Sequence, residues 1–225
     1  MSMGRGLKTE NRPQRPAKRA ADPEMAANRR LLLKREARLR RFGYDSRVGI
    51  QFVLAQALPL GGKVLEVGTG KGRFLIRLAR HVKAVVSVDV SAEEQRCARL
   101  NARNAGVERK IQFVLRDARR LPWANETFDA AVTMNAMHHI ANFGQVLREM
   151  LRVVKPGGKI VLADFSPRGF QIIARAHRDE GRTHPREFYD FRALAQTLRK
   201  RGLATRLRKG ANQEVLIGRL PAAAA

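Results

Sequence analysis

The sequence predicts an α/β fold in which helices cover both faces of a doubly wound, mostly parallel sheet. From residue 63 onward, short apolar runs alternate with helical segments, which is the pattern of repeated βαβ units. The runs are continuously apolar rather than alternating, as expected for strands that are buried on both faces. A glycine-rich turn follows the first run, and folds of this kind bind ligands at the carboxyl ends of their strands.

Local composition predicts the individual elements. The apolar, β-branched runs predict strands at residues 63–67, 84–90, 111–115, 128–134, 159–163, 203–208 and 214–220. The segments between them predict helices at residues 73–80, 92–105, 143–154 and 187–201. We expect Lys155-Pro156-Gly157-Gly158 to break the chain between the third of these helices and the fifth strand.

The chain before the first strand divides into two parts. Residues 1–22 combine Gly, Pro and basic residues with almost nothing to bury, so we expect a disordered basic tail. Residues 23–58 are expected to form an N-terminal helical extension, and Asp22-Pro23 is a typical helix start. Residues 59–220 then form the main domain, and residues 221–225 a frayed C-terminus.

Composition excludes several classes of protein. A chain of 225 residues, 44% of them hydrophobic, is long enough to bury a core as one domain, and no apolar run approaches the length of a membrane span. The single cysteine, Cys97, cannot pair within the chain or form a CxxC metal or redox motif, so we expect no metal site. No apolar segment follows the basic N-terminus, and we expect a reducing, cytoplasmic setting.

The net charge of +25 is concentrated toward the ends of the chain. Residues 1–41 hold 13 basic and 4 acidic residues, residues 42–170 hold 20 and 11, and residues 171–225 hold 12 and 5. This distribution predicts contact with a polyanion such as nucleic acid through residues 1–41. An alternative stays open, because 34 Arg against 11 Lys is also the outcome of GC-rich codon usage.

The glycine-rich turn indicates which kind of ligand binds at the end of the first strand. It reads VLEVGTGKGRF over residues 64–74, with glycines at 68, 70 and 72. Arg73 occupies the position of the third glycine in the dinucleotide pattern GxGxxG, which disfavours a nicotinamide-dependent oxidoreductase. Glu66 precedes the first glycine by two residues and suits a cationic ligand better than a pyrophosphate.

Polar residues follow the next three expected strands. Asp89 lies nineteen residues after Gly70, where a carboxylate accepts both hydroxyls of a ribose. Asp117-Ala118 follows the third strand, and Asn135 follows the fourth.

These motifs, in this order, resemble the class I S-adenosylmethionine-dependent methyltransferases, in particular the broad group of small methyltransferases that includes quinone-biosynthesis enzymes. The resemblance extends from about Lys63 to Phe165. It rests on the segments EVGTGKGRF, VDVS, RDARRLPWANETFDAAV, NAMHHI and LREMLRVVKPGGKIVLADF. It implies a Rossmann-like methyltransferase fold of seven strands whose last strand, here Glu214 to Leu220, is antiparallel, and S-adenosyl-L-methionine as the cofactor.

The resemblance also implies roles for single residues. Glu66, Gly68 and Gly70 line the methionine part of the cofactor, and Gly72 either joins them or serves helix packing alone. Asp89 holds the ribose. Three further residues are implied around the adenine and after the fourth strand: Asp117, Ala118 and Asn135.

Three residues are candidates for catalysis. Methyl transfer from a sulfonium is an in-line displacement, so most of the rate comes from positioning and a base is optional. If the acceptor is a hydroxyl or an activated carbon, His138, His139 or Asp164 is in place to take a proton, with a packing role as the alternative for the histidines.

The sequence argues against two classes of methyl acceptor but does not identify the acceptor. Enzymes that methylate base amines resemble one another in a (D/N)PP(Y/F) motif, whereas Ala136 and Met137 follow Asn135 here. Pyrimidine C5 methylation needs a nucleophilic cysteine near the fourth and fifth strands, and Cys97 lies elsewhere. A small-molecule acceptor is favoured; the alternative is an RNA or ribosome-associated methyltransferase or binding scaffold that uses the basic tail. Residues 165–186 are expected to shape the acceptor site.

Replacing Gly70 by Val is expected to abolish binding of S-adenosylmethionine, because a side chain at this position keeps the backbone from approaching the ligand. Asp89→Ala should weaken binding by a few kcal/mol at most, as for a lost charge-assisted hydrogen bond. Calorimetric titration measures both effects, and unchanged affinity in the Gly70→Val protein contradicts the assignment of the turn.

Overall fold

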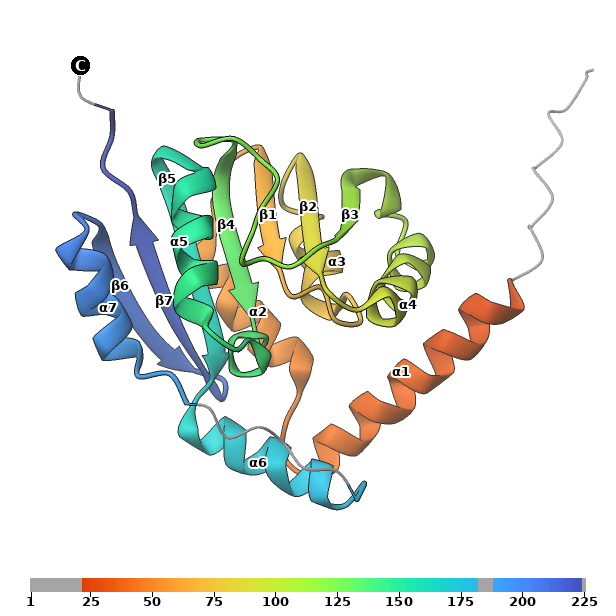
Figure 1. Ribbon diagram of the computed structural model, residues 1–225. Coiled ribbons are helices and arrows are strands. Elements are labelled where there is room, and N and C mark those ends of the chain that lie inside the picture. Colours follow the sequence, from red (N-terminus) through yellow and green to blue (C-terminus); the bar gives the residue numbers. More distant parts are fainter. Residues whose placement is uncertain (1–21, 182–187, 224–225) are drawn as a thin grey trace, which may run out of the picture.

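The computed structural model describes residues 22–181 and 188–223, which form a seven-stranded sheet covered by helices on both faces (Figure 1). The strands are β1 (Lys63–Val67), β2 (Ala84–Asp89), β3 (Ile111–Leu115), β4 (Phe128–Met134), β5 (Val154–Phe165), β6 (Ala204–Gly210) and β7 (Gln213–Arg219). Their order across the sheet is β3-β2-β1-β4-β5-β7-β6. Only β7 runs antiparallel to its neighbours, β5 and β6. The structure confirms the expected fold, with the antiparallel strand between β5 and β6.

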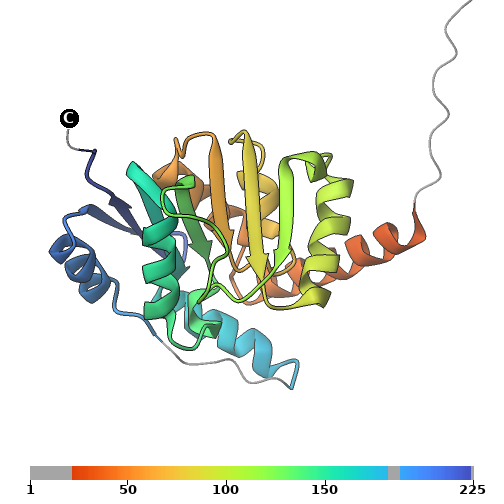
Figure 2. The same ribbon diagram turned by 45° about the horizontal axis from the view of Figure 1, so that its top comes forward.

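Two apolar clusters cover the faces of the sheet, because successive strand residues point to opposite sides. One cluster contains Val64 of β1 and residues of α2 (Ser46–Ala57), α3 (Arg73–Leu78) and α4 (Ala92–Asn104). The other contains Leu65 of β1 and residues of α5 (Phe143–Val153) and α7 (Phe191–Lys200). Figure 2 shows α5 and α3 on opposite sides of the sheet.

A third cluster closes one end of the sheet. It joins Leu39 of α1 (Pro23–Arg41) and Tyr44 to Phe165 at the end of β5 and to Phe170 and Ile173 of α6 (Pro167–Arg178). Figure 1 shows α6 and the C-terminal part of α1 beyond the carboxyl ends of the parallel strands. This end is therefore covered by helices rather than open.

Side-chain caps fix several helix starts. Asp22 accepts a hydrogen bond from the backbone N–H of Glu24 at 2.9 Å, and Asp45 accepts one from Arg47 at 2.9 Å. Both helices of the N-terminal extension begin at these caps, and the first begins at the Asp22-Pro23 start that the sequence predicts. In the part of the chain that the structure describes, no helix has the length and apolar character needed to cross a membrane.

Two segments differ from the sequence expectation. Helix α6 lies within residues 165–186, for which no element was predicted, although Ser166 caps it through Gly169 N–H at 3.2 Å and Pro167 begins it. Strand β5 starts at Val154, so Lys155 to Gly158 do not separate helix from strand; the pairing with β4 instead shifts register between Phe128 and Ala130. The irregular register absorbs the Pro-Gly-Gly sequence without ending the strand.

The expected helix at residues 187–201 is shorter in the described chain, where α7 begins at Phe191. Residue 187 lies outside the described residues, as do residues 1–21 of the expected tail.

Candidate functional site

A cavity of about 600 Å³ lies at the carboxyl ends of the parallel strands, beneath α1 and α6. Its size is that of a pocket for a cofactor-sized ligand. Of the residues predicted from the sequence, those that line it are Glu66, Gly68, Gly70, Asp89, Asp117, Ala118, Asn135, His138 and His139. The structure therefore brings together nine residues that span seventy-four positions of the chain.

The glycine turn between β1 and α3 needs left-handed backbone at two lining positions. Gly68 has φ +89°, and an added Cβ there would lie 2.3 Å from Cβ of Ala136. Gly70 has φ +46°, and an added Cβ would have nothing within 4 Å among the described residues, because Gly70 faces the cavity. Gly70 thus presents bare backbone to a ligand.

Gly72 is not part of the cavity wall. A Cβ at this position would lie 3.0 Å from Cβ of Ala98, so Gly72 permits close packing of the start of α3 against α4. Of the two roles the sequence left open, this position favours helix packing over cofactor contact.

A buried hydrogen-bond network joins the glycine turn to β2. The Ser87 hydroxyl donates to the Glu66 carboxyl group and lies 2.6 Å from the Thr69 hydroxyl. The amide of Gln95 donates to the carbonyl of Val114 at 2.9 Å and to that of Ser87 at 3.3 Å. The pKa of Glu66 is raised to about 8: burial is the main cause and the charge of nearby Asp89 adds to it, while the hydrogen bond from Ser87 opposes the rise.

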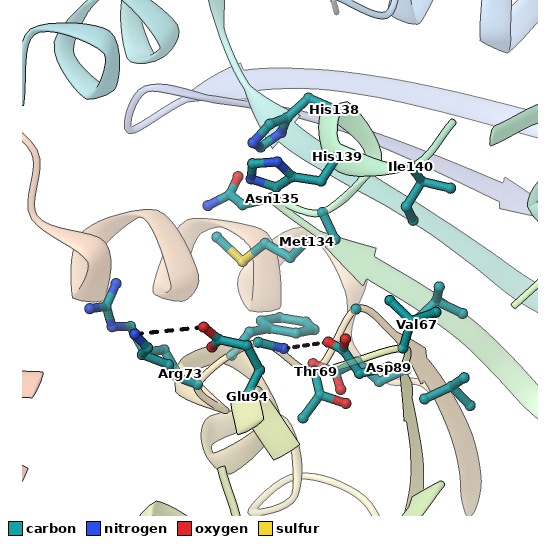
Figure 3. Close-up of a pocket in the computed structure, with 18 of the residues that line it drawn as sticks. Val67, Thr69, Arg73, Asp89, Glu94, Met134, Asn135, His138, His139 and Ile140 are labelled. Carbon is teal, nitrogen blue, oxygen red and sulfur yellow. Dashed lines mark hydrogen bonds and ion pairs between the residues drawn. The ribbon is translucent and has the colours of Figure 1, made fainter. Parts of the chain in front are cut away.

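Asp89 joins the turn to the second strand. Its carboxylate accepts hydrogen bonds from the backbone N–H of Gly70 and of Ser91, both at 2.9 Å (Figure 3). Next to it, the side chain of Val90 lines the cavity although it is 71% exposed. A carboxylate beside an exposed apolar side chain offers hydrogen bonds to a sugar and a flat surface to a ring.

Asp117 and Ala118 continue this wall beyond β3. The Asp117 carboxylate accepts from the backbone N–H of Arg119 at 2.8 Å and from its guanidinium, and this contact lowers the pKa of Asp117. Ala118 is buried beneath it.

Asn135 follows β4 in left-handed backbone, with φ +53°. Its Nδ2 donates to the Tyr44 hydroxyl at 3.2 Å, and Nε2 of Gln213 donates to the same hydroxyl at 3.1 Å. Burial raises the pKa of Tyr44 to about 12. Tyr44 therefore fixes the segment after α1 to the ends of β4 and β7 as a neutral phenol.

The histidine pair divides into two environments. His138 is buried, and its Nδ1 lies 2.8 Å and 2.9 Å from the two carboxylate oxygens of Asp164. His139 is exposed at the cavity wall, with its ring centroid 4.1 Å from that of His138. Asp164 lies behind His138 and does not line the cavity, so it is placed to orient the imidazole rather than to touch a ligand.

Helices α1 and α6 both contribute residues to the cavity wall. Ile173 and His177 of α6 lie within residues 165–186, the segment expected to shape the acceptor site. The sequence analysis did not select Arg35 and Leu39 of α1, because they reach the cavity only when the helix folds over the end of the sheet. Residues 1–41 are consequently not a separable basic arm, since residues 22–41 include part of the cavity wall.

The comparisons with known proteins agree with this geometry. Residues 65–162 match the family model described as a methyltransferase domain. This part of the chain is therefore similar to methyltransferase domains. The match confirms the class that the sequence resembles and S-adenosyl-L-methionine as the cofactor that this class implies.

Curated relatives and solved structures extend the match. Methyltransferase GfsG of Streptomyces halstedii is 41% identical over 110 residues, which are 48% of this chain and 40% of that protein. The 27-O-demethylrifamycin SV methyltransferase of Amycolatopsis mediterranei is 34% identical over 137 residues, 57% of this chain and 50% of that protein. This chain thus spans half or less of the length of these two relatives. A SAM-dependent methyltransferase of Aquifex aeolicus superimposes with a TM-score of 0.62 at 22% identity, over 82% of this chain and 98% of that one, which shows a shared fold.

Replacing Glu66 by Gln is expected to flatten the pH dependence of stability. The folded-state pKa of about 8 lies above the ordinary 4.5, so the unfolded chain loses this proton first as the pH rises. The wild-type protein therefore loses stability from Glu66 between these two values, by at most ~1.4 kcal/mol per pH unit. Denaturant unfolding at the two ends of this window measures the effect, with the exposed Glu93→Gln as control. Parallel pH profiles for the Glu66→Gln and wild-type proteins contradict it.

Proposed function

We propose that the protein transfers a methyl group from S-adenosyl-L-methionine to a hydroxyl of a small, largely apolar molecule. The observation that carries this proposal is the buried pair of His138 and Asp164 at the cavity wall. A base held in this way serves an acceptor that must lose a proton as it attacks.

The cavity fits the cofactor at several points. Asp89 is placed for the ribose hydroxyls, exposed Val90 for a face of the adenine, and the bare backbone at Gly70 for the chain that follows the ribose. Glu66 offers a carboxyl group to the positively charged end. When bound, the cofactor supplies an electrophilic methyl group on a sulfonium and departs as S-adenosylhomocysteine.

The imidazole of His138 is the proposed base. The Asp164 carboxylate accepts a hydrogen bond from Nδ1–H, which fixes the tautomer in which Nε2 is the basic nitrogen. Nε2 takes the proton of the acceptor hydroxyl, and the negative Asp164 stabilises the imidazolium that forms. Removal of the proton by His138 would leave the acceptor oxygen free to take the methyl group that the cofactor supplies.

The remaining wall of the cavity supports an apolar acceptor. Leu39, Phe165 and Ile173 lie there, on α1, β5 and α6, around the end of the sheet that carries His138. The rifamycin relative is named for a small-molecule substrate methylated at oxygen. The apolar cavity wall and the substrate named for this relative therefore both support O-methylation of a small molecule.

Labelling separates this function from the RNA-based alternative. We expect the protein, incubated with methyl-labelled S-adenosylmethionine and cell extract, to transfer label to the small-molecule fraction and not to RNA or protein. Label in RNA favours the alternative, in which basic residues among residues 1–41 attract phosphates. Binding of S-adenosylhomocysteine with no transfer to any fraction favours a scaffold.

Replacing His138 by Gln should lower turnover with the labelled fraction by roughly a hundredfold or more, because the base is lost. Affinity for S-adenosylhomocysteine should stay near the wild-type value, which also reports that the variant is folded. His139→Gln is the matched control: it lies next in the chain and lines the same cavity, and it should lose turnover only modestly.

Asp164→Asn should also lower turnover and change its pH profile, since the amide does not stabilise an imidazolium. Equal, modest losses in the His138 and His139 variants contradict the assignment of the base.

A further inference from the structure

Two arginines from distant parts of the chain line the same cavity. Arg35 lies on α1, and Arg73 is the first residue of α3, directly after the glycine turn. Neither is needed for the proton transfer described above. Their position within a ligand cavity calls for a separate explanation.

Several of their N–H groups are buried without an acceptor. Within residues 22–181 and 188–223, Nε of Arg35 and both Nε and Nη2 of Arg73 are shielded from solvent and make no hydrogen bond. Leaving a buried donor without an acceptor destabilises a protein, and more so when the donor is charged. Such donors are kept in a binding site when a ligand satisfies them.

The local charge favours an anion. The Glu36 carboxylate lies 3.8 Å from Nε of Arg73, an ion pair too long to be a hydrogen bond. Burial and the neighbouring charge of Arg35 lower the pKa of Arg73. Two guanidinium groups against one carboxylate leave one positive charge, while Lys71 nearby is paired with Glu94 at 3.6 Å.

We propose that Arg35 and Arg73 bind the carboxylate at the amino-acid end of the cofactor. This inference rests on the proposed function. Figure 3 shows Arg73 well to the side of Asp89, and Gly70, whose N–H donates to Asp89, also lines the cavity three residues before Arg73. A chain that leaves the ribose and crosses Gly70 therefore reaches Arg73 at its far end.

Guanidinium chemistry suits this role, because its planar donors match the two oxygens of a carboxylate. The same contact links α1 to the main domain, since Arg35 and Arg73 lie on different elements. A cofactor analogue that lacks the carboxylate would not connect α1 to the main domain in this way.

A thermodynamic cycle tests the carboxylate contact. The probes are S-adenosylhomocysteine and its decarboxylated analogue, which keeps the amine and differs only in the carboxylate. In the wild-type protein, removing the carboxylate should weaken binding about tenfold or more. In Arg35→Gln and Arg73→Gln that penalty should shrink to a few-fold at most, because the partner of the carboxylate is gone.

Matched controls carry the same loss of charge. Arg40 lies on α1 and Arg80 follows α3, and both side chains are exposed and outside the cavity wall. The Arg40→Gln and Arg80→Gln proteins should therefore lose as much affinity as the wild-type protein when the carboxylate is removed. Arg73→Lys keeps the charge and should retain part of the penalty.

Each outcome separates the two proposals. The same penalty in wild-type and Gln variants overturns the carboxylate contact and assigns the arginines to the acceptor or to stability. An equal loss of affinity for both probes, with the penalty unchanged, also overturns it, because it reports general damage to the cavity. If the wild-type protein binds neither probe, the proposed function itself fails.

Discussion

The glycine turn after β1 is held in place by hydrogen bonds to β2, and the arrangement of the site depends on this anchoring. The backbone N–H of Gly70 donates to the Asp89 carboxylate at 2.9 Å, and that of Gly68 donates to the carbonyl of Val88 at 2.9 Å. On the other side, Gly68 leaves no room for a Cβ against Ala136. The turn is thus confined between the ends of β2 and β4, and it directs the first residue of α3, Arg73, toward the cavity.

The cavity has walls of two different origins. Polar groups come from the carboxyl ends of adjacent parallel strands, which always meet at one edge of such a sheet. The apolar wall comes from α1 and α6, joined through Leu39, Phe165, Phe170 and Ile173. In the proposed function the cofactor lies along the first wall and the acceptor against the second, with His138 between them.

The cavity wall carries groups of both charges. Asp89 and Asp117 lie along the strand ends, where Arg119 pairs with Asp117, and Arg35 and Arg73 lie on α1 and α3. This combination suits a ligand that carries both a cationic centre and a carboxylate. Burial raises the pKa of the Glu66 carboxyl group to about 8, whereas Asp89 and Asp117 on the same side of the cavity are only partly buried.

Sequence alone determined the order of the strands along the chain, the glycine turn and the residues at the strand ends, because these depend on local pattern and on spacing. It also identified His138 and Asp164 as candidates, but not their relation: the 2.8 Å contact joins residues twenty-six positions apart and requires β4 and β5 to pair in register. Arg35 and Leu39 carry no local signal, since their place in the cavity is decided by how α1 packs over the end of the sheet. Likewise, whether Gly72 meets a ligand or a helix was decided by the approach of Ala98, a contact between segments that no sequence pattern relates.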